Sequence, residues 1–241
     1  MTSARSAAGF SLAEMAITLL IITLLSAGAL LTLRIQTEHG RFAQTQAALL
    51  EAKQALLAYA AAQGALPCPA DPAQMGGASF GAARSTCSGD LRRGLLPWRT
   101  LGVQGLDAWD QYLSYEVSNN FTVTPGKTSV GNITVVLDSN DPATDAVAFA
   151  LWSHGANGNG AISVQNTLRS TPTDTNEISN RSAGFSTPLR VVLRTQSDSF
   201  DDQGLYVSRY VVLKQLMDAG FSLSDSTSSS ASSAANSSAS P

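Results

Sequence analysis

The sequence predicts an α+β protein in which one long N-terminal helix packs on an antiparallel β-sheet head and a disordered, Ser-rich tail follows. Three observations lead to this fold class. An apolar run over residues 10–33 continues into an amphipathic pattern that reaches residue 63. Short runs rich in β-branched and aromatic residues, separated by turn-forming residues, fill the middle of the chain. Residues 222–241 are nearly all Ser, Ala, Asn, Thr and Asp, which cannot bury enough apolar surface to order themselves.

The apolar run follows a short polar leader, residues 1–9, for which we expect no fold. Phe10 to Leu33 supplies 24 residues, and about 20 suffice for a helix to span a bilayer. Residues 10–33 are therefore predicted to form a transmembrane helix. Glu14 is the one charged residue within it, and a carboxylate in a membrane helix usually has a partner because its burial alone is costly. The leader offers no obvious partner.

Residues 34–63 are predicted to continue the same helix with one apolar face. Gly64 and Pro67 follow this pattern, as they do at the end of a helix. The head should cover the apolar stripe, since fewer than three heptads are present for an autonomous coiled coil. The stripe consists of Phe42, Thr45, Leu49, Ala52, Leu56 and Tyr59.

Two cysteines, Cys68 and Cys87, lie in a Pro- and Gly-rich stretch over residues 66–106. If the preceding helix crosses a membrane, this stretch reaches an oxidising compartment, where thiols pair. Structural zinc takes four ligands, and no His lies near the two thiols. We therefore expect a disulfide that closes the loop 68–87.

The head, residues 64–221, should continue with an antiparallel sheet and end in a short helix. The helix is predicted over Asp202–Met217, with Asp201 or Asp202 as N-cap and Gly220 as its stop. Its apolar face would hold Tyr206, Tyr210, Leu213 and Met217. The strands are predicted within 112–117, 133–137, 147–152 and 189–195.

Composition limits the partners of the chain. Its 241 residues suffice for one domain beyond the apolar run. The net charge is −3, and it would be −4 without Arg5 of the leader, which does not favour nucleic acid. The one basic cluster contains an acidic residue, Asp90, so a solvated loop face is a better interpretation than a DNA-binding patch. The cluster consists of Arg84, Arg92, Arg93 and Arg99.

The start of the chain resembles the processing signal of type IV prepilins and type II secretion pseudopilins. A polar leader ends in Gly9, Phe10 follows, Glu14 is the fifth residue after the leader, and an apolar run comes next. The resemblance implies cleavage between Gly9 and Phe10 by a prepilin peptidase and N-methylation of Phe10. It also implies that Glu14 pairs with the Phe10 amine of a neighbouring subunit. A general secretory signal peptide and a plain membrane anchor are alternatives, but neither explains these residues together.

The family implies a function as well as a maturation pathway. The chain would be a structural subunit, not an enzyme, of a type IV pilus or a type II secretion pseudopilus. It would sit in the inner membrane with lipid around its helix and its head in the periplasm. The assembly platform and other subunits, contacted through the N-terminal helix, would then bring it into a filament. A head of about 160 residues favours a minor subunit over the repeated shaft subunit.

The head resembles pseudopilins more loosely. The similar segments are 66–69, 96–102 and 107–112, and Asp110 stands where these proteins have Gly. Residues 153–160 and 176–180 resemble the calcium-loop region of major pseudopilins. Calcium takes six to eight oxygen ligands, whereas this chain offers Asn157 and Asn159 with only Asp174 and Glu177 as acids. A Gly/Asn turn is the better interpretation, so we expect no metal and no cofactor.

One motif suggests a different class of function. Residues 77–81 satisfy G-x-S-x-G with Ser79 at the centre, which would make the chain a membrane-anchored periplasmic hydrolase. That motif works at a strand-to-helix turn, and the loop 68–87 shows no strand pattern. Both histidines are expected in non-catalytic places, His39 on the helix and His154 as a polar surface group in a loop.

Overall fold

The computed structural model contains two units, Met1–Ala43 and Gln44–Pro241, which are described separately. Side chains of residues 27–35 and 142–143 are not described. The transmembrane prediction for 10–33 and the leader prediction for 1–9 thus lie wholly or partly outside the described residues, as do the strand residue Leu189 and most of the tail. The described residues are 11–138, 142–143, 146–183, 190–197 and 199–224.

The first element, α1, is a single helix over Leu12–Gln63. It ends where the sequence predicts, because Gly64 adopts φ +79° and its N–H donates to the carbonyl of Ala60 at 2.8 Å. Within the described residues, no helix has a run both long enough and apolar enough to cross a membrane.

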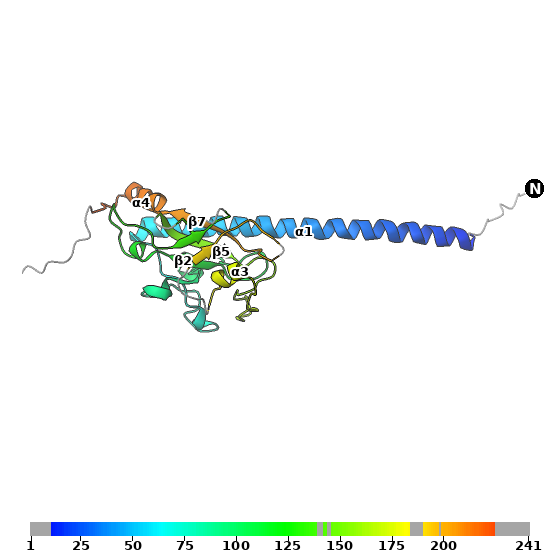
Figure 1. Cartoon of the computed structure of the whole chain (residues 1–241), viewed down its shortest axis with the longest axis horizontal. Coiled ribbons are helices and arrows are strands. Elements are labelled where there is room, and N and C mark those ends of the chain that lie inside the picture. Colours follow the sequence, from blue (N-terminus) through cyan, green and yellow to red (C-terminus); the bar gives the residue numbers. More distant parts are fainter. Residues whose placement is uncertain (1–10, 139–141, 144–145, 184–189, 198, 225–241) are drawn as a thin grey trace, which may run out of the picture. The chain divides into compact units, whose positions relative to one another are not determined.

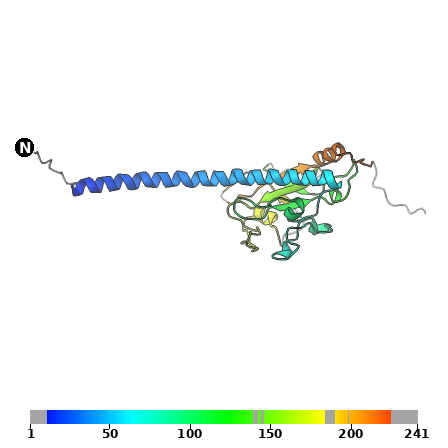
Figure 2. The ribbon, with the colours of Figure 1, turned by 180° about the vertical axis from the view of Figure 1, so that it is seen from behind.

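The second half of α1 packs on the head through the predicted stripe. Its buried positions recur every three or four residues and face a core built from one side of a sheet. Figure 1 shows the strands in front of this half of the helix, and Figure 2, from behind, shows the helix in front of the strands. Phe42 and Tyr59 are half-buried, and the buried positions are Thr45, Leu49, Ala52, Leu56 and Ala60.

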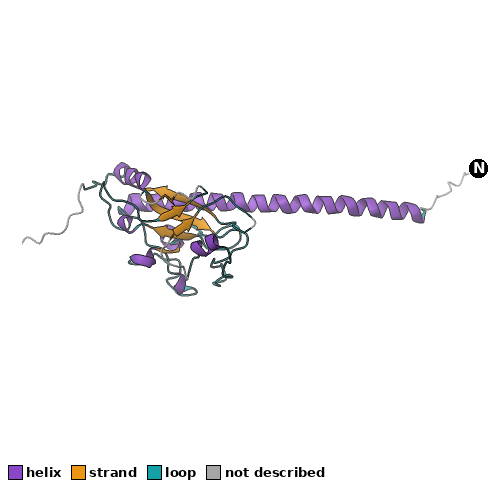
Figure 3. Cartoon of the chain, in the orientation of Figure 1, coloured by secondary structure: helices purple, strands orange, loops and turns teal. Residues whose placement is uncertain are grey.

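The sheet behind this helix is antiparallel, with the strand order β1-β2-β5-β7. Alternate side chains point to opposite faces, so Tyr115 and Leu151 pack toward α1 while Trp152 packs away from it. The strands are gathered beside one another in Figure 3. They are β1 (Arg93–Leu95), β2 (Ser114–Val117), β5 (Val147–Ser153) and β7 (Gln203–Ser208).

A second, smaller sheet covers the other face and departs from the predicted arrangement. Ile133, Val135 and Val191 pack there against Trp152. Strands β3 and β6 run parallel to each other, so the expectation of a purely antiparallel head is wrong in this sheet. A parallel pair is possible because β5 and α3 lie between the two strands in the chain. The strands are β4 (Pro142–Ala143), β3 (Thr134–Val136) and β6 (Arg190–Val192).

Short helices occupy the connections between the strands. The stretch 66–106, predicted as a loop, contains several of them together with strand β1. The short helices are η1 (Pro72–Gln74), η2 (Gly89–Arg92), α2 (Trp98–Leu101), η3 (Asn119–Phe121) and α3 (Thr175–Asn180).

The predicted C-terminal helix is wrong in its first half. Residues 203–208 form β7, in which Leu205 and Val207 contact the core at a spacing of two. The helix α4 covers only Arg209–Asp218. It begins after Ser208 rather than Asp201 or Asp202, and it buries Val212, Leu213 and Leu216 while Tyr206, Tyr210 and Met217 are exposed. Pairing with β5 outweighs the helical spacing of the tyrosines. The predicted stop is confirmed, since Gly220 adopts φ +91°.

The beginning of the predicted tail is also part of the fold. Leu223 is only 7% exposed and belongs to the core that covers α1. The carbonyl of Ser224 accepts from the N–H of Lys127 at 3.0 Å. Residues 223 and 224, predicted as part of the tail, therefore belong to the fold. The prediction missed them because a single Leu in a polar sequence gives no periodic signal.

Truncation should separate these residues from the rest of the tail. Removing residues 225–241 should leave the free energy of unfolding unchanged, whereas removing 222–241 should lower it by about 1.5–3 kcal/mol through lost burial of Leu223. Urea denaturation of the full chain and of both truncations measures this. Leu223→Ala in the full chain is the matched control and should reproduce most of the loss. Equal stability of the two truncations would contradict the assignment.

Candidate functional site

Glu14 is the described member of the predicted processing and assembly site, because Gly9 and Phe10 lie outside the described residues. It lies in the first turn of α1, where its Oε2 accepts from the N–H of Ser11 at 2.9 Å. The N–H of Glu14 in turn donates to the Ser11 hydroxyl at 3.3 Å. This reciprocal pair is a capping box. The partner of Glu14 thus lies just after the leader, and the S-x-x-E spacing from Ser11 to Glu14 is its sequence signature.

The part of α1 around and after Glu14, from Leu12 to Leu25, exposes apolar side chains around the helix. Nine large apolar residues are between 48% and 93% exposed. A helix that is apolar on every side requires an apolar environment, and a contiguous patch of this kind marks an interaction surface. The residues are Leu12, Met15, Ile17, Leu19, Leu20, Ile21, Ile22, Leu24 and Leu25.

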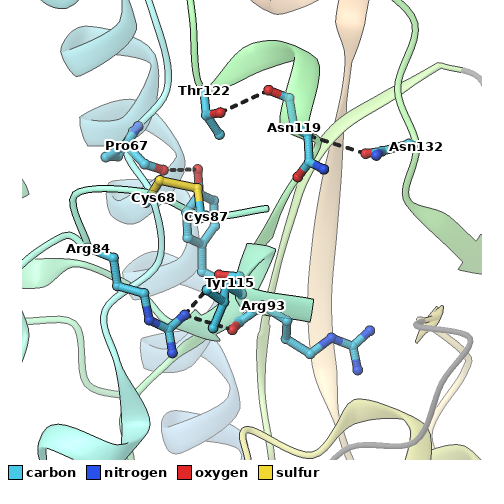
Figure 4. The surroundings of a disulfide bond; sticks show 10 residues. Pro67, Cys68, Arg84, Cys87, Arg93, Tyr115, Asn119, Thr122 and Asn132 are labelled. Atoms are coloured by element: carbon cyan, nitrogen blue, oxygen red, sulfur yellow. Dashed lines mark hydrogen bonds between the residues drawn. A yellow bond between two sulfur atoms is a disulfide. The ribbon is translucent and has the colours of Figure 1, made fainter. Parts of the chain in front are cut away.

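The expected disulfide between Cys68 and Cys87 is present, with 5.6 Å between the two Cα atoms. Both residues are buried in the core that covers α1. Beside them the hydroxyl of Tyr115 donates to the carbonyl of Pro67 at 3.1 Å (Figure 4). The bridge therefore fixes the chain just after α1 against the sheet.

The basic cluster is not the solvated loop face that we expected, since only Arg99 of its four members is exposed. Arg93 is fully buried against Glu116, and Arg92 also pairs with Glu116 at 3.2 Å. Arg84 pairs with Asp71 at 3.0 Å and donates to the carbonyl of Arg93 (Figure 4). Arg99 donates to the carbonyl of Ala78. Three of the four cations are thus paired with carboxylates of the head, which reduces the charge available for phosphates.

Ser79 lines a cavity of about 420 Å³, but no histidine is among the described residues of its wall. Its hydroxyl lies 3.3 Å from Gln74 Oε1. The nearby acid, Asp71, is a weak base: burial acts to raise its pKa, but the N–H of Ala73 and the Arg84 guanidinium outweigh burial and lower the pKa. None of the described residues around Ser79 is a base that could deprotonate its hydroxyl for nucleophilic attack.

His154 is buried rather than exposed in a loop as expected. Its Nε2 lies 2.9 Å from the hydroxyls of Ser114 and Ser182. Burial lowers the pKa of His154 to about 3, so the imidazole is neutral. A Ser and His pair without solvent access cannot reach a substrate, and the group therefore acts in packing. No local pattern predicts this hydrogen-bonded group, because Ser114, His154 and Ser182 come from distant segments of the chain.

The turn around Asp110 forms without the Gly that the resemblance led us to expect at this position. Asp110 adopts φ +60°, a left-handed conformation that Asp tolerates better than most residues. Asp107 Oδ1 accepts from the N–H groups of Trp109 and Gln111, both at 2.9 Å, and stabilises the turn.

The Gly/Asn turn near residue 157 has donors that do not fit calcium. Asn157 Oδ1 accepts from the N–H of Asn159 at 2.7 Å, so its amide nitrogen must face Glu177. That nitrogen donates to Glu177 Oε1 at 2.7 Å, and Asn159 Nδ2 donates to Oε2 at 3.4 Å. Asp174 caps α3 through the N–H of Asn176 and is not free for a metal. Amide hydrogens therefore occupy the side of Glu177 where calcium would need oxygens.

Comparison of the chain with protein-family models, with curated proteins and with solved structures found no match.

Loss of the disulfide should destabilise the head. Cys68→Ser should lower the free energy of unfolding by about 2–5 kcal/mol, because the bridge restricts the unfolded chain. Urea denaturation measures the loss, and Cys87→Ser should give the same value because both remove one bond. Labelling of thiols in the folded, unreduced protein should find none, and significant labelling would contradict the pairing.

Buried His154 should make stability depend on pH. Its pKa is about 3 in the folded protein and about 6.5 when unfolded, so below pH 6.5 the unfolded chain takes up a proton that the folded chain does not. Stability contributed by neutral His154 is therefore complete above pH 6.5 and is lost as pH falls toward 3. Between pH 7 and pH 5 wild type should lose about 2 kcal/mol more than His154→Gln. Urea denaturation at both values measures the difference, and equal losses would show that His154 does not titrate in this way.

Proposed function

We propose that this chain is a structural subunit, matured by cleavage after Gly9, of a type IV pilus or a type II secretion pseudopilus. The observation that carries the proposal is the set of nine exposed apolar side chains on α1 between Leu12 and Leu25, in a segment that follows Gly9 and Phe10 and contains Glu14. Burial of each such side chain contributes about 1.5–3 kcal/mol. Membrane lipid before assembly and the helices of neighbouring subunits afterwards would provide that burial.

The proposed maturation follows the resemblance of the N-terminus. A prepilin peptidase would cut between Gly9 and Phe10, and Phe10 would then be N-methylated. The chain would cross the inner membrane once and place its head in the periplasm, where the assembly platform would extract it into the filament. The disulfide at Cys68 and Cys87 supports an oxidising compartment for the head.

Glu14 is proposed to set the register between subunits. In a filament core the Phe10 amine of the neighbouring subunit would be the counter-charge, because either charge alone in an apolar core costs several kcal/mol. The capping box gives Glu14 a second role, since its carboxylate also accepts from the N–H of Ser11 at 2.9 Å. The charge and the cap can be separated by mutation.

A minor position, at the tip of the filament, is proposed over a place in the shaft. The head carries a disulfide-closed loop and two sheets, which is bulky for a subunit repeated along a thin filament. No property of the described head favours DNA uptake, since the arginines near residue 93 are paired internally.

The second candidate, a membrane-anchored periplasmic hydrolase using Ser79, loses support. Ser79 lies in a turn, not between a strand and a helix as the G-x-S-x-G nucleophile does. Its hydroxyl has Gln74 as its partner, and the described wall of its cavity provides no histidine.

Variants of Glu14 test assembly separately from cleavage. Glu14→Ala should be cleaved normally, since the scissile bond is five residues away, and it should fail to enter filaments because the neighbouring amine is left unpaired. Glu14→Gln keeps a capping box but has no charge, so it should fail as well. Gly9→Ala should stop cleavage. Gel sizing, recovery of sheared filaments and mass spectrometry of the mature N-terminus measure these steps.

Ser11→Ala is the matched control, because it removes the hydroxyl of the capping box and keeps the Glu14 charge. It should assemble better than Glu14→Gln. If Glu14→Gln entered filaments at the wild-type level while Ser11→Ala did not, the helix cap rather than the charge would be the essential feature. A mature N-terminus other than Phe10 would contradict the proposed family assignment itself.

A further inference from the structure

Three carboxyl groups, which we call the acidic cluster, meet between α3 and the start of β7. They belong to Glu177, Asp201 and Asp202, and each brings an oxygen within 4.8 Å of the others. Glu177 and Asp202 are each only 2% exposed. Three negative charges this close, and shielded from water, repel one another strongly.

Two oxygens of the cluster lack a hydrogen-bond donor among the described residues. Asp202 Oδ2 accepts from Asn180 Nδ2 at 2.7 Å, and Asp201 Oδ2 accepts from the N–H of Asn157 at 2.8 Å. The Oδ1 atoms of both aspartates are buried and have no partner. A buried acceptor of this kind costs about 1–3 kcal/mol, and more when it is charged. The two Oδ1 atoms therefore need either a cation or a hydrogen-bond donor nearby.

The spacing of the carboxyl groups and the donors around Glu177 favour a proton over a metal ion. Glu177 and Asp201 each bring an oxygen within 4.8 Å of the other. Each of two carboxyl groups this close disfavours ionisation of the other, and a proton on one of them removes the repulsion. Glu177 is already surrounded by the amide hydrogens of Asn157 and Asn159, which would repel a metal ion.

The charged neighbours that raise the pKa of Glu177 and of Asp202 are acidic. On α3, Asp174 adds a further negative charge near Asp202. From the preceding loop, His154 is neutral. In the sheet, Arg93 is paired with Glu116. After β6, Arg194 lines a groove with Asp202, but its charge acts on Asp138. Two further arginines flank the region: the aliphatic part of Arg181 lies against Gly160, and Arg190 Nε donates to the hydroxyl of Ser179.

We propose that the acidic cluster is a proton-binding site, in which Glu177, Asp201 and Asp202 share at least one proton that takes the place a cation would fill. The proton would hold α3 against β7, and its loss at alkaline pH would weaken this contact. In agreement, burial raises the pKa of Glu177 and of Asp201, and it raises the pKa of Asp202 furthest. The contact between α3 and β7 would thereby be stabilised at acidic pH.

The sign of the pH effect follows from proton uptake. Because the pKa of these carboxyls is raised in the folded state, the folded chain holds a proton that the unfolded chain releases above about pH 4. This stabilisation is complete below the unfolded pKa and is lost as pH rises through the folded pKa. It is opposite in sign to the effect of His154, which every variant below retains.

Isosteric amides test the proposal, because Asn and Gln imitate the protonated acids. Urea denaturation of the full chain, in a metal chelator and over a pH series from 5 to 9, gives the unfolding equilibrium constant. Relative to Asp202→Asn, the constant of wild type should rise up to tenfold per pH unit while the proton is released. Asp202→Asn should be the more stable protein at pH 8. Glu177→Gln provides the same comparison if Asp202→Asn does not fold.

Asp138→Asn is the matched control, since this carboxylate is near the surface and hydrogen-bonds to Thr195. It should keep the wild-type dependence on pH. Parallel curves for wild type and both amide variants would overturn the proposal. So would a stabilisation of wild type by added calcium that Asp202→Asn lacks, because the cluster would then be a cation site.

Discussion

The buried side chain of Arg93 connects both sheets of the head with α3. It pairs with Glu116 on the neighbouring strand at 2.6 Å and donates to the carbonyls of Ser179 and Arg190. Its guanidinium also lies 5.2 Å from the centre of the Trp152 ring. A buried guanidinium cannot move far from its carboxylate, because loss of one partner of a buried ion pair costs about 3–5 kcal/mol. The positions of β2, α3 and β6 are therefore tied to one residue of β1.

Asn180 extends this polar network to the strands around it. Its carbonyl accepts from Trp152 Nε1, and its amide bonds both the N–H and the carbonyl of Val192 at 2.7 Å. The same amide reaches Asp202 in the acidic cluster. A helix of six residues such as α3 is unstable alone, so these contacts and its Asp174 cap hold it in place. The network explains why a loop rich in Asn and Gly is ordered without a regular helix or sheet.

Helix α1 contains two kinds of surface in one continuous element. From Thr45 to Ala60 one stripe is buried against the head, and Leu50 is the one large apolar residue that is exposed. From Leu12 to Leu25 the large apolar side chains are exposed on all sides. The same secondary structure thus serves a folded core in one part and, in the proposed function, lipid and neighbouring subunits in the other. The head is stabilised by the core that it shares with the second half of α1 and by the bridge at Cys68 and Cys87.

The sequence by itself determined the elements whose signals are local. A period of three to four residues and Gly64 specified α1 and its end, and two cysteines left one disulfide pairing. Tertiary structure decided the rest: β7 in place of a helix, the parallel pair of β3 and β6, and the burial of His154 and Arg93. Each of these depends on partners far away in the chain, as Arg93 depends on Glu116 and Arg190. The free energy that selects them comes from pairing and desolvation, which a local pattern does not record.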